Sequence, residues 1–157
     1  MPFFADMFIE PGQLIEYKGK KIYSADFIYG PKEFKAIVSM ISTNSEYKQG
    51  LSFNMTGMKG KVTYDGHTLT NGGFKFWEDK VPKEFTVDVK IEEGVLLINN
   101  FCDNTGTGSC VSGFSGFAMR IEDVSENKKR YYCNDFDPND DFDDLIFEIE
   151  FIESEKY

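Results

Sequence analysis

The regular alternation of apolar and polar side chains over residues 84–91 constrains the fold more than any other feature of this sequence. Phe85, Val87, Val89 and Ile91 fall on one face, and Thr86, Asp88 and Lys90 fall on the other. Because successive side chains of a strand point to opposite faces, this pattern predicts a strand with one face on a core. Glu92, Glu93 and Gly94 then predict a turn into residues 95–99, and we expect the two strands to pair as an antiparallel hairpin.

Short segments of the same kind recur along the chain, with turn residues every 8 to 12 positions. Asp65-Gly66 is typical of a tight hairpin turn. Residues 33–42 also fit a helical face, but their β-branched content favours a strand. Further strands are expected at residues 3–9, 14–17, 21–29, 51–55, 61–64, 74–77, 113–122, 130–133 and 144–152. The sequence therefore predicts one all-β domain over residues 1–157, an antiparallel β-sandwich or jelly roll.

The net charge of −10 is concentrated near the carboxyl terminus. Residues 131–157 contain ten acidic residues and one lysine, whereas residues 1–130 are nearly neutral. A chain with this balance has no basic surface for nucleic acid, so we expect no nucleic-acid partner. Cations or a basic protein partner are the complementary ligands.

No apolar run is long enough to span a membrane, and the first residues lack the pattern of a secretory signal. As written, the sequence predicts a cytoplasmic protein, or an extracellular one if a targeting segment was removed. The three cysteines leave two readings open. Either all are reduced thiols, or Cys102 and Cys110 pair across the short polar loop between them.

The acidic loop at residues 134–144 is the strongest candidate site. Six aspartates and two asparagines crowd together there before a strongly apolar strand, and oxygen ligands of this kind suit calcium. Asp135, Asp137 and Asn139 stand at alternate positions, as the first ligands of an EF-hand do. However, Asp140 replaces the required glycine and Ile146 the final glutamate, so the loop is not an EF-hand. An ion-free acidic loop is the alternative.

Residues 140–147 (Asp-Asp-Phe-Asp-Asp-Leu-Ile-Phe) resemble the short acidic signature of calcium-binding β-sandwich modules in bacterial adhesins and surface proteins. The resemblance covers about a dozen residues. It implies that Asp141, Asp143 and Asp144 are calcium ligands and that Phe142 is buried. Asp135, Asp137 and Asn139 lie outside the matched string and are added to the predicted ligand set on spacing alone.

No catalytic constellation is evident, so we expect a protein that is not an enzyme. His67 is the single histidine, and the serine-containing segments lack the spacing of a nucleophile elbow. Flat aromatic side chains could instead bind a ligand. Trp77 is expected to be partly exposed at a strand end. Tyr131 and Tyr132 face opposite sides of one strand, so one of the two should point outward beside the acidic loop.

Two functional hypotheses follow. The first is a calcium-binding β-sandwich module that binds a carbohydrate or a protein. The second is a cytosolic acidic inhibitor, or immunity-type protein, that binds a basic protein through the acidic loop. The first predicts stabilisation by calcium, and the second predicts salt-sensitive binding to a cationic protein.

Overall fold

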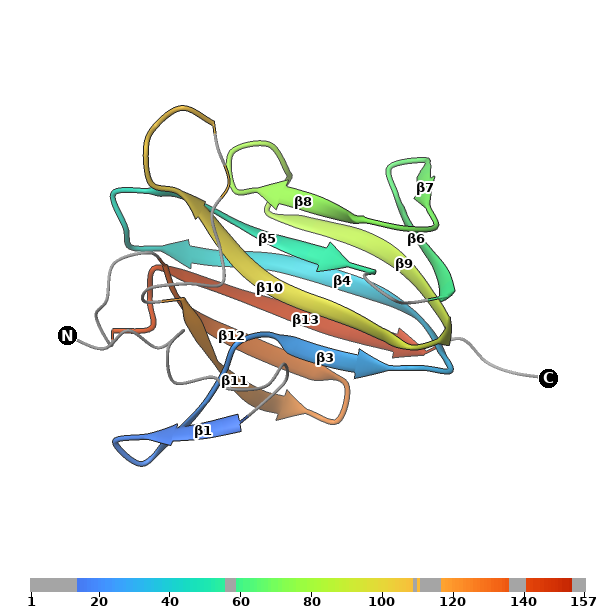
Figure 1. Cartoon of the computed structure of the whole chain (residues 1–157), viewed down its shortest axis with the longest axis horizontal. Helices are drawn as coiled ribbons and strands as arrows, with labels where there is room; N and C mark the ends of the chain where they lie inside the picture. Colours follow the sequence, from blue (N-terminus) through green and yellow to red (C-terminus); the bar gives the residue numbers. More distant parts are fainter. Residues whose placement is uncertain (1–13, 56–58, 109, 111–116, 136–140, 154–157) are drawn as a thin grey trace.

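The computed structural model describes residues 14–55, 59–108, 110, 117–135 and 141–153, which form thirteen β-strands and no helix. The described strands form two antiparallel sheets, so the prediction of an all-β sandwich is confirmed (Figure 1). The jelly-roll subtype stays a prediction. The expected strand at residues 3–9 and the start of the one at 113–122 lie outside the described residues. Within the described part of the chain, no helix is long and apolar enough to cross a membrane.

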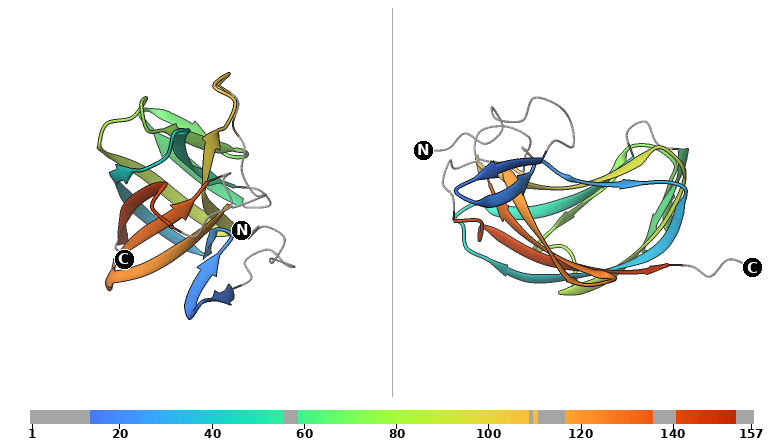
Figure 2. Two further views of the ribbon diagram at one scale, coloured as in Figure 1. Left: turned by 90° about the vertical axis from the view of Figure 1, so that its left-hand side faces the viewer. Right: turned by 90° about the horizontal axis from the view of Figure 1, so that it is seen from below.

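The larger sheet has nine strands among the described residues. In spatial order they are β1 (Leu14–Tyr17), β2 (Lys20–Tyr23), β11 (Ala118–Ser125), β12 (Lys128–Asn134), β13 (Leu145–Glu153), β4 (Lys32–Thr43), β9 (Glu84–Glu93), β6 (Lys59–Tyr64) and β7 (His67–Leu69). The smaller sheet contains β3 (Asp26–Tyr29), β10 (Val95–Asp103), β5 (Lys48–Asn54) and β8 (Gly73–Trp77). Figure 2 shows the two layers facing each other across a shared interior.

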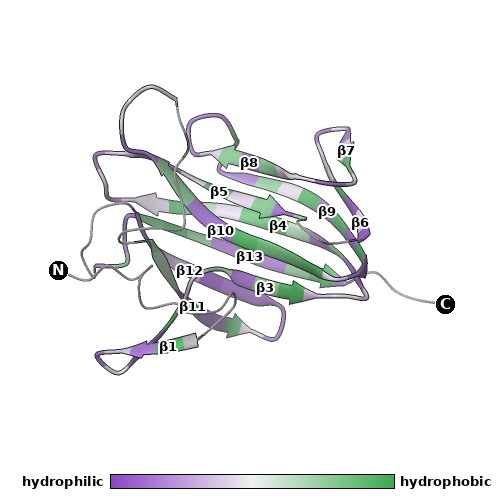
Figure 3. Ribbon diagram, viewed as in Figure 1, coloured by the Kyte–Doolittle hydropathy of each residue, from purple (hydrophilic) through white to green (hydrophobic). Residues whose placement is uncertain are grey.

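A single large apolar cluster fills the space between the sheets. The larger sheet contributes side chains such as Phe34, Val38 and Phe147, and the smaller sheet contributes Phe53 and Ile98. Figure 3 shows the alternation of apolar and polar residues that puts these side chains on the inner faces. Burying one such side chain stabilises the fold by about 1.5–3 kcal/mol, so this shared core holds the two layers together.

Three local predictions that rest on residue patterns are confirmed, but the single strand expected at residues 21–29 is divided between β2 in the larger sheet and β3 in the smaller one. Residues 84–91 lie in β9 with every second side chain buried, and the ambiguous segment at residues 33–42 lies in β4. Asp65 and Gly66, with φ angles of 50° and 79°, close the β6–β7 hairpin. Positive φ at both central residues is the condition of a type I′ turn, which explains the choice of this residue pair.

The predicted hairpin across Gly94 is wrong. β9 pairs with β4 and β6 in the larger sheet, whereas β10 pairs with β3 and β5 in the smaller one. Gly94, at a φ of 89°, turns the chain from one layer to the other. Alternation shows which face of a strand is buried but not which strand is its neighbour, and in a sandwich consecutive strands can belong to different sheets.

We expect Gly50→Ala to destabilise the smaller sheet. A Cβ atom at Gly50 would lie 2.5 Å from Cζ of Phe101 and 2.8 Å from the carbonyl oxygen of Phe76. Such overpacking costs about 1–3 kcal/mol, which urea denaturation would measure. Thr86→Ala, on the exposed face of β9, is the control and should cost less than about 1 kcal/mol. An unchanged Gly50→Ala midpoint would contradict this packing.

Candidate functional site

The acidic loop joins the end of β12 to the start of β13 at one end of the sandwich. The β4–β5 connection and the end of β10 lie at the same end, on the left of Figure 1. Asn134, Asp135 and residues 141–144 are described there. Asp137 and Asn139, two of the predicted metal ligands, lie outside the described residues.

The alternation of side chains along each strand explains why polar side chains lie at this end of the core. Gln49 precedes the core residue Leu51 by two positions, Asn100 follows Ile98 by two, and Asp135 follows Cys133 by two. Each therefore continues an inward-facing row. Together with Asn134 and Asp144 they form a buried layer that we name the polar end layer: Gln49, Asn100, Asn134, Asp135 and Asp144.

Asp135 is the centre of the polar end layer and is fully buried. Its Oδ2 accepts hydrogen bonds from Ser45 Oγ and from Gln49 Nε2, the latter at 2.9 Å. Its backbone N–H donates to Oδ2 of Asp144 at 2.9 Å. The two carboxyl groups are thus neighbours, as the predicted ligand set requires, and they are buried where repulsion between two negative charges is poorly screened.

Burial raises the pKa of Asp144 from 3.8 to about 7. The hydrogen bond from the Asp135 backbone lowers this pKa, while the negative charges of Asp135 and Asp143 raise it. Burial also raises the pKa of the neighbouring Cys133 thiol, and the charge of Asp144 adds to that rise. Near neutral pH a proton on Asp144, or a positive charge beside it, would therefore relieve the repulsion between the two carboxyl groups.

The loop is anchored by apolar and polar contacts on both sides. Phe142, at a φ of 54°, is 2% exposed and packs with Ile22 and Ala118, so the buried aromatic implied by the motif is observed. Its backbone N–H donates to Asn134 Oδ1 at 2.8 Å. Asn100 Nδ2 in turn donates to the Asn134 carbonyl oxygen at 2.7 Å.

Buried oxygens without hydrogen-bond partners lie beside the carboxyl pair. Among the described residues, these are Gln49 Oε1 and Asp143 Oδ1, with a third, Asn104 Oδ1, in the β10–β11 connection. The other Asp143 oxygen accepts from Asn44 Nδ2 at 2.8 Å. An unpartnered buried acceptor is costly, and a hard cation would satisfy such oxygens.

The structure brings together only part of the predicted metal set. Asp135 and Asp144 are neighbours, and the charge of Asp143 acts on Asp144, whereas Asp141 is exposed. Within the described residues no three acidic, histidine or cysteine side chains converge closely enough to hold an ion by themselves. Neutral oxygens also lie close to the Asp135–Asp144 pair. Those of Ser45, Tyr47 and Gln49 come from the polar stretch after β4, which sequence reasoning did not connect with the acidic loop.

The predicted ligand-binding aromatics divide into three cases. Trp77 is half-buried. Its ring meets that of Phe101 edge-on, with the ring centroids 4.6 Å apart, and Lys48 Nζ lies 5.5 Å from the Trp77 ring centroid. Tyr132 is half-buried, and its hydroxyl donates to Glu122 at 3.0 Å. Tyr131 cannot contact a ligand at the surface, because it is fully buried. Tyr132 lies on the other face of β12, where it packs against the small cluster of Ile22, Ala118 and Phe142.

A hollow of about 440 Å³ opens beside the polar end layer. It lies between the β4–β5 connection and the end of β10, and it is lined by Glu46, Tyr47, Lys48, Asp103, Asn104, Thr105, Gly106 and Gly108. The Asp103 carboxylate accepts from the backbone N–H groups of Gly108, Gly106 and Thr105 at 2.7–3.1 Å, and these bonds lower its pKa. Asp103 therefore shapes the rim of this hollow.

The cysteines form no disulfide: Cys102, Cys110 and Cys133 are all free thiols. His67 is exposed at the start of β7. Comparison with known proteins adds no relative, since no family model matches the chain and neither a curated protein nor a solved structure matches it.

Proposed function

We propose that the protein is a non-catalytic binding module in which calcium holds the loop end of the sandwich, and that this end binds a carbohydrate or a protein. The observation that carries the proposal is the buried Asp135–Asp144 carboxyl pair next to the unpartnered oxygens of Gln49 and Asp143. The donor atoms of this pair and of the two unpartnered groups are all oxygens, and calcium takes six to eight oxygens in flexible geometry.

The Gln49 amide suggests where the ion would lie. Its Nε2 donates to Tyr47 O at 3.0 Å and to Asp135 Oδ2 at 2.9 Å, while its own oxygen has no partner. A cation bound to the Tyr47 carbonyl oxygen and to Asp135 Oδ2 would replace the two hydrogen bonds that Gln49 now donates to these oxygens. Rotation of the terminal amide would then bring Oε1 to the ion as a further ligand.

Calcium would also organise the ligand-binding surface. Tyr47 offers its carbonyl oxygen to the ion while it lines the hollow beside the polar end layer. Trp77 lies next to this hollow, because Lys48, which lines the hollow, contacts the Trp77 ring. Ion binding at the Tyr47 carbonyl would fix the wall of that hollow, which would make ligand binding depend on calcium.

The burial of these acids weakens the alternative of an acidic inhibitor. Asp135 and Asp144 are buried in the polar end layer, and Glu148 pairs with Arg130 at 2.8 Å. Less of the carboxyl-terminal charge is therefore presented to a basic protein than the sequence alone suggests. A surface that recognises a cationic partner needs exposed, unpaired charge.

Thermal melting tests the proposal. With an affinity of about 10⁻⁴–10⁻³ M, 10 mM calcium should stabilise the protein by about 1–3 kcal/mol and raise its melting temperature by roughly 3–10 °C over EDTA. Magnesium at the same concentration is the control and should do less, because it prefers a smaller octahedral site. A melting temperature that is identical in EDTA and calcium would refute the proposal.

A further inference from the structure

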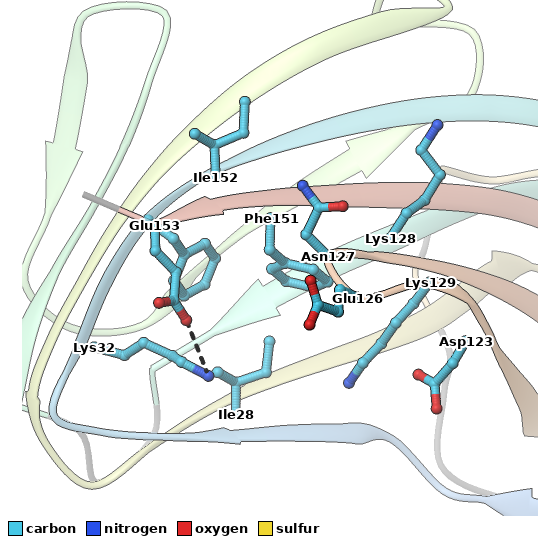
Figure 4. A pocket seen from close by; sticks show the side chains of 11 residues that line it. Ile28, Lys32, Asp123, Glu126, Asn127, Lys128, Lys129, Phe151, Ile152 and Glu153 are labelled. Carbon is cyan, nitrogen blue, oxygen red and sulfur yellow. Dashed lines mark ion pairs between the residues drawn. The ribbon is translucent and has the colours of Figure 1, made fainter. Parts of the chain in front are cut away.

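A second hollow, of about 510 Å³, lies at the opposite end of the sandwich from the acidic loop. The end of β13, the β11–β12 turn, β3 and the start of β4 surround it (Figure 4). It is lined by Ile28, Lys32, Phe34, Asp123, Glu126, Asn127, Lys128, Lys129, Phe151, Ile152 and Glu153. Its volume is within the range of small-molecule sites.

The inner wall of this hollow is apolar and aromatic. Ile28 and Phe34 are 7% and 2% exposed, and both belong to the main core. Phe151 is half-buried, and its ring meets that of Phe34 edge-on at 5.3 Å. A ligand in this hollow must therefore offer an apolar surface to these side chains.

The ammonium group of Lys129 lies on the polar side of the hollow. Lys129 Nζ lies 3.2 Å from Asp26 Oδ2 and 5.7 Å from the centroid of the Phe151 ring. Asp26 also accepts a hydrogen bond from the buried Tyr131 hydroxyl at 2.6 Å. Lys129 therefore places a cation within cation–π distance of the Phe151 ring.

The lining residues retain one carboxylate in excess once Lys129 is paired with Asp26 and Lys32 with Glu153, because Asp123 and Glu126 then stand against Lys128. Within the described residues, Asp123 and Glu126 form no ion pair. Glu153 contacts Lys32 at 3.7 Å, and both side chains of that pair are exposed. Figure 4 shows Lys128 pointing away from the side chains gathered around Lys129. The potential inside the hollow therefore favours a positive ligand.

We propose that this hollow binds a small organic cation, an ammonium or guanidinium group on an aryl or alkyl stem. The stem packs on Phe151, Ile28 and Phe34, and the charged group faces Glu126 and Asp123. A single lysine side chain of a partner protein would fill only part of a hollow of this volume, which favours a small molecule as the occupant.

Calorimetry in EDTA tests the proposal separately from calcium binding. Phenethylamine is the probe, and 3-phenylpropionate, with a similar stem and the opposite charge, is the control ligand. We expect the amine to bind and the acid not to bind. The double variant Asp123→Asn, Glu126→Gln should weaken amine binding about fivefold or more. The double variant Asp65→Asn, Glu84→Gln makes an equal charge change at exposed positions outside the hollow and should not weaken it.

Three results would overturn the proposal: equal or tighter binding of phenylpropionate, unchanged amine affinity in the double variant, or no binding of either probe. Binding of a lysine-rich peptide without binding of the amine would overturn it as well, in favour of a protein partner. Circular dichroism melts of the double variant establish that it folds, since both substituted side chains are exposed.

Discussion

Asp144→Asn should raise the melting temperature in EDTA at pH 8 and abolish the stabilisation by calcium. In the folded protein burial raises the pKa of Asp144 to about 7, whereas in the unfolded chain the pKa is near its ordinary value. The folded state therefore binds this proton more tightly than the unfolded state does. From about pH 4 to pH 7 the group's contribution to stability falls as pH rises, and above pH 7 the full penalty remains.

The substitution removes the penalty without removing the local hydrogen bond. An asparagine oxygen can accept the Asp135 backbone N–H that Asp144 Oδ2 now accepts at 2.9 Å. We expect a gain of about 1–2 kcal/mol at pH 8, below the full electrostatic value because water at the loop screens part of the charge. The same change removes one of the two buried carboxylates, so calcium should no longer raise the melting temperature.

Melting curves in EDTA from pH 4 to pH 8 would measure the effect. The wild-type melting temperature should decline over this interval more steeply than that of Asp144→Asn. Asp141→Asn is the matched control for stability in EDTA, because it changes the same charge at an exposed position of the same loop. Parallel pH profiles for wild type and Asp144→Asn would show that the carboxyl group pays no cost for burial.

The strands with clear alternation could be predicted from the sequence, because alternation is a local pattern. β9 is the clearest case, since its apolar side chains all fall on one face. The sheet to which a strand belongs could not be predicted, as the turn at Gly94 shows. Its neighbouring strands enter different sheets, and their choice depends on contacts with β3, β4, β5 and β6.

Only the contiguous part of the candidate site could be predicted from the sequence, because contacts between distant residues depend on the arrangement of the sheets. The acidic loop is contiguous in sequence, and its charge density alone indicates a cation site. Gln49 is 86 residues away from Asp135 and reaches it because the start of β5 and the end of β12, which belong to different sheets, meet at the same end of the sandwich. Tyr131 and Tyr132 show what alternation cannot predict. It placed the two side chains on opposite faces of the strand, but it did not show which face was the interior.

Phe147→Ala should give the largest loss of stability among these variants. Phe147 is fully buried, and its ring stacks on Tyr131 at a centroid distance of 4.6 Å and an interplanar angle of 9°. Truncation of a buried phenylalanine costs about 3–5 kcal/mol, a large share of the 5–15 kcal/mol that stabilises a typical domain. Urea denaturation would measure the loss. Ile152→Ala, at a 43% exposed position of the same strand, should cost less than about 1 kcal/mol.

The Phe147 variant also tests whether the loop site is independent of the core beneath it. Three residues of strand place Phe147 about 10 Å along β13 from Asp144, so the two energetic effects should add. Calcium should then stabilise Phe147→Ala by the same increment as the wild type. A smaller increment would mean that the Asp135–Asp144 pair is held in place by β13 packing. The calcium site would then form only as the sandwich closes around the Tyr131–Phe147 stack.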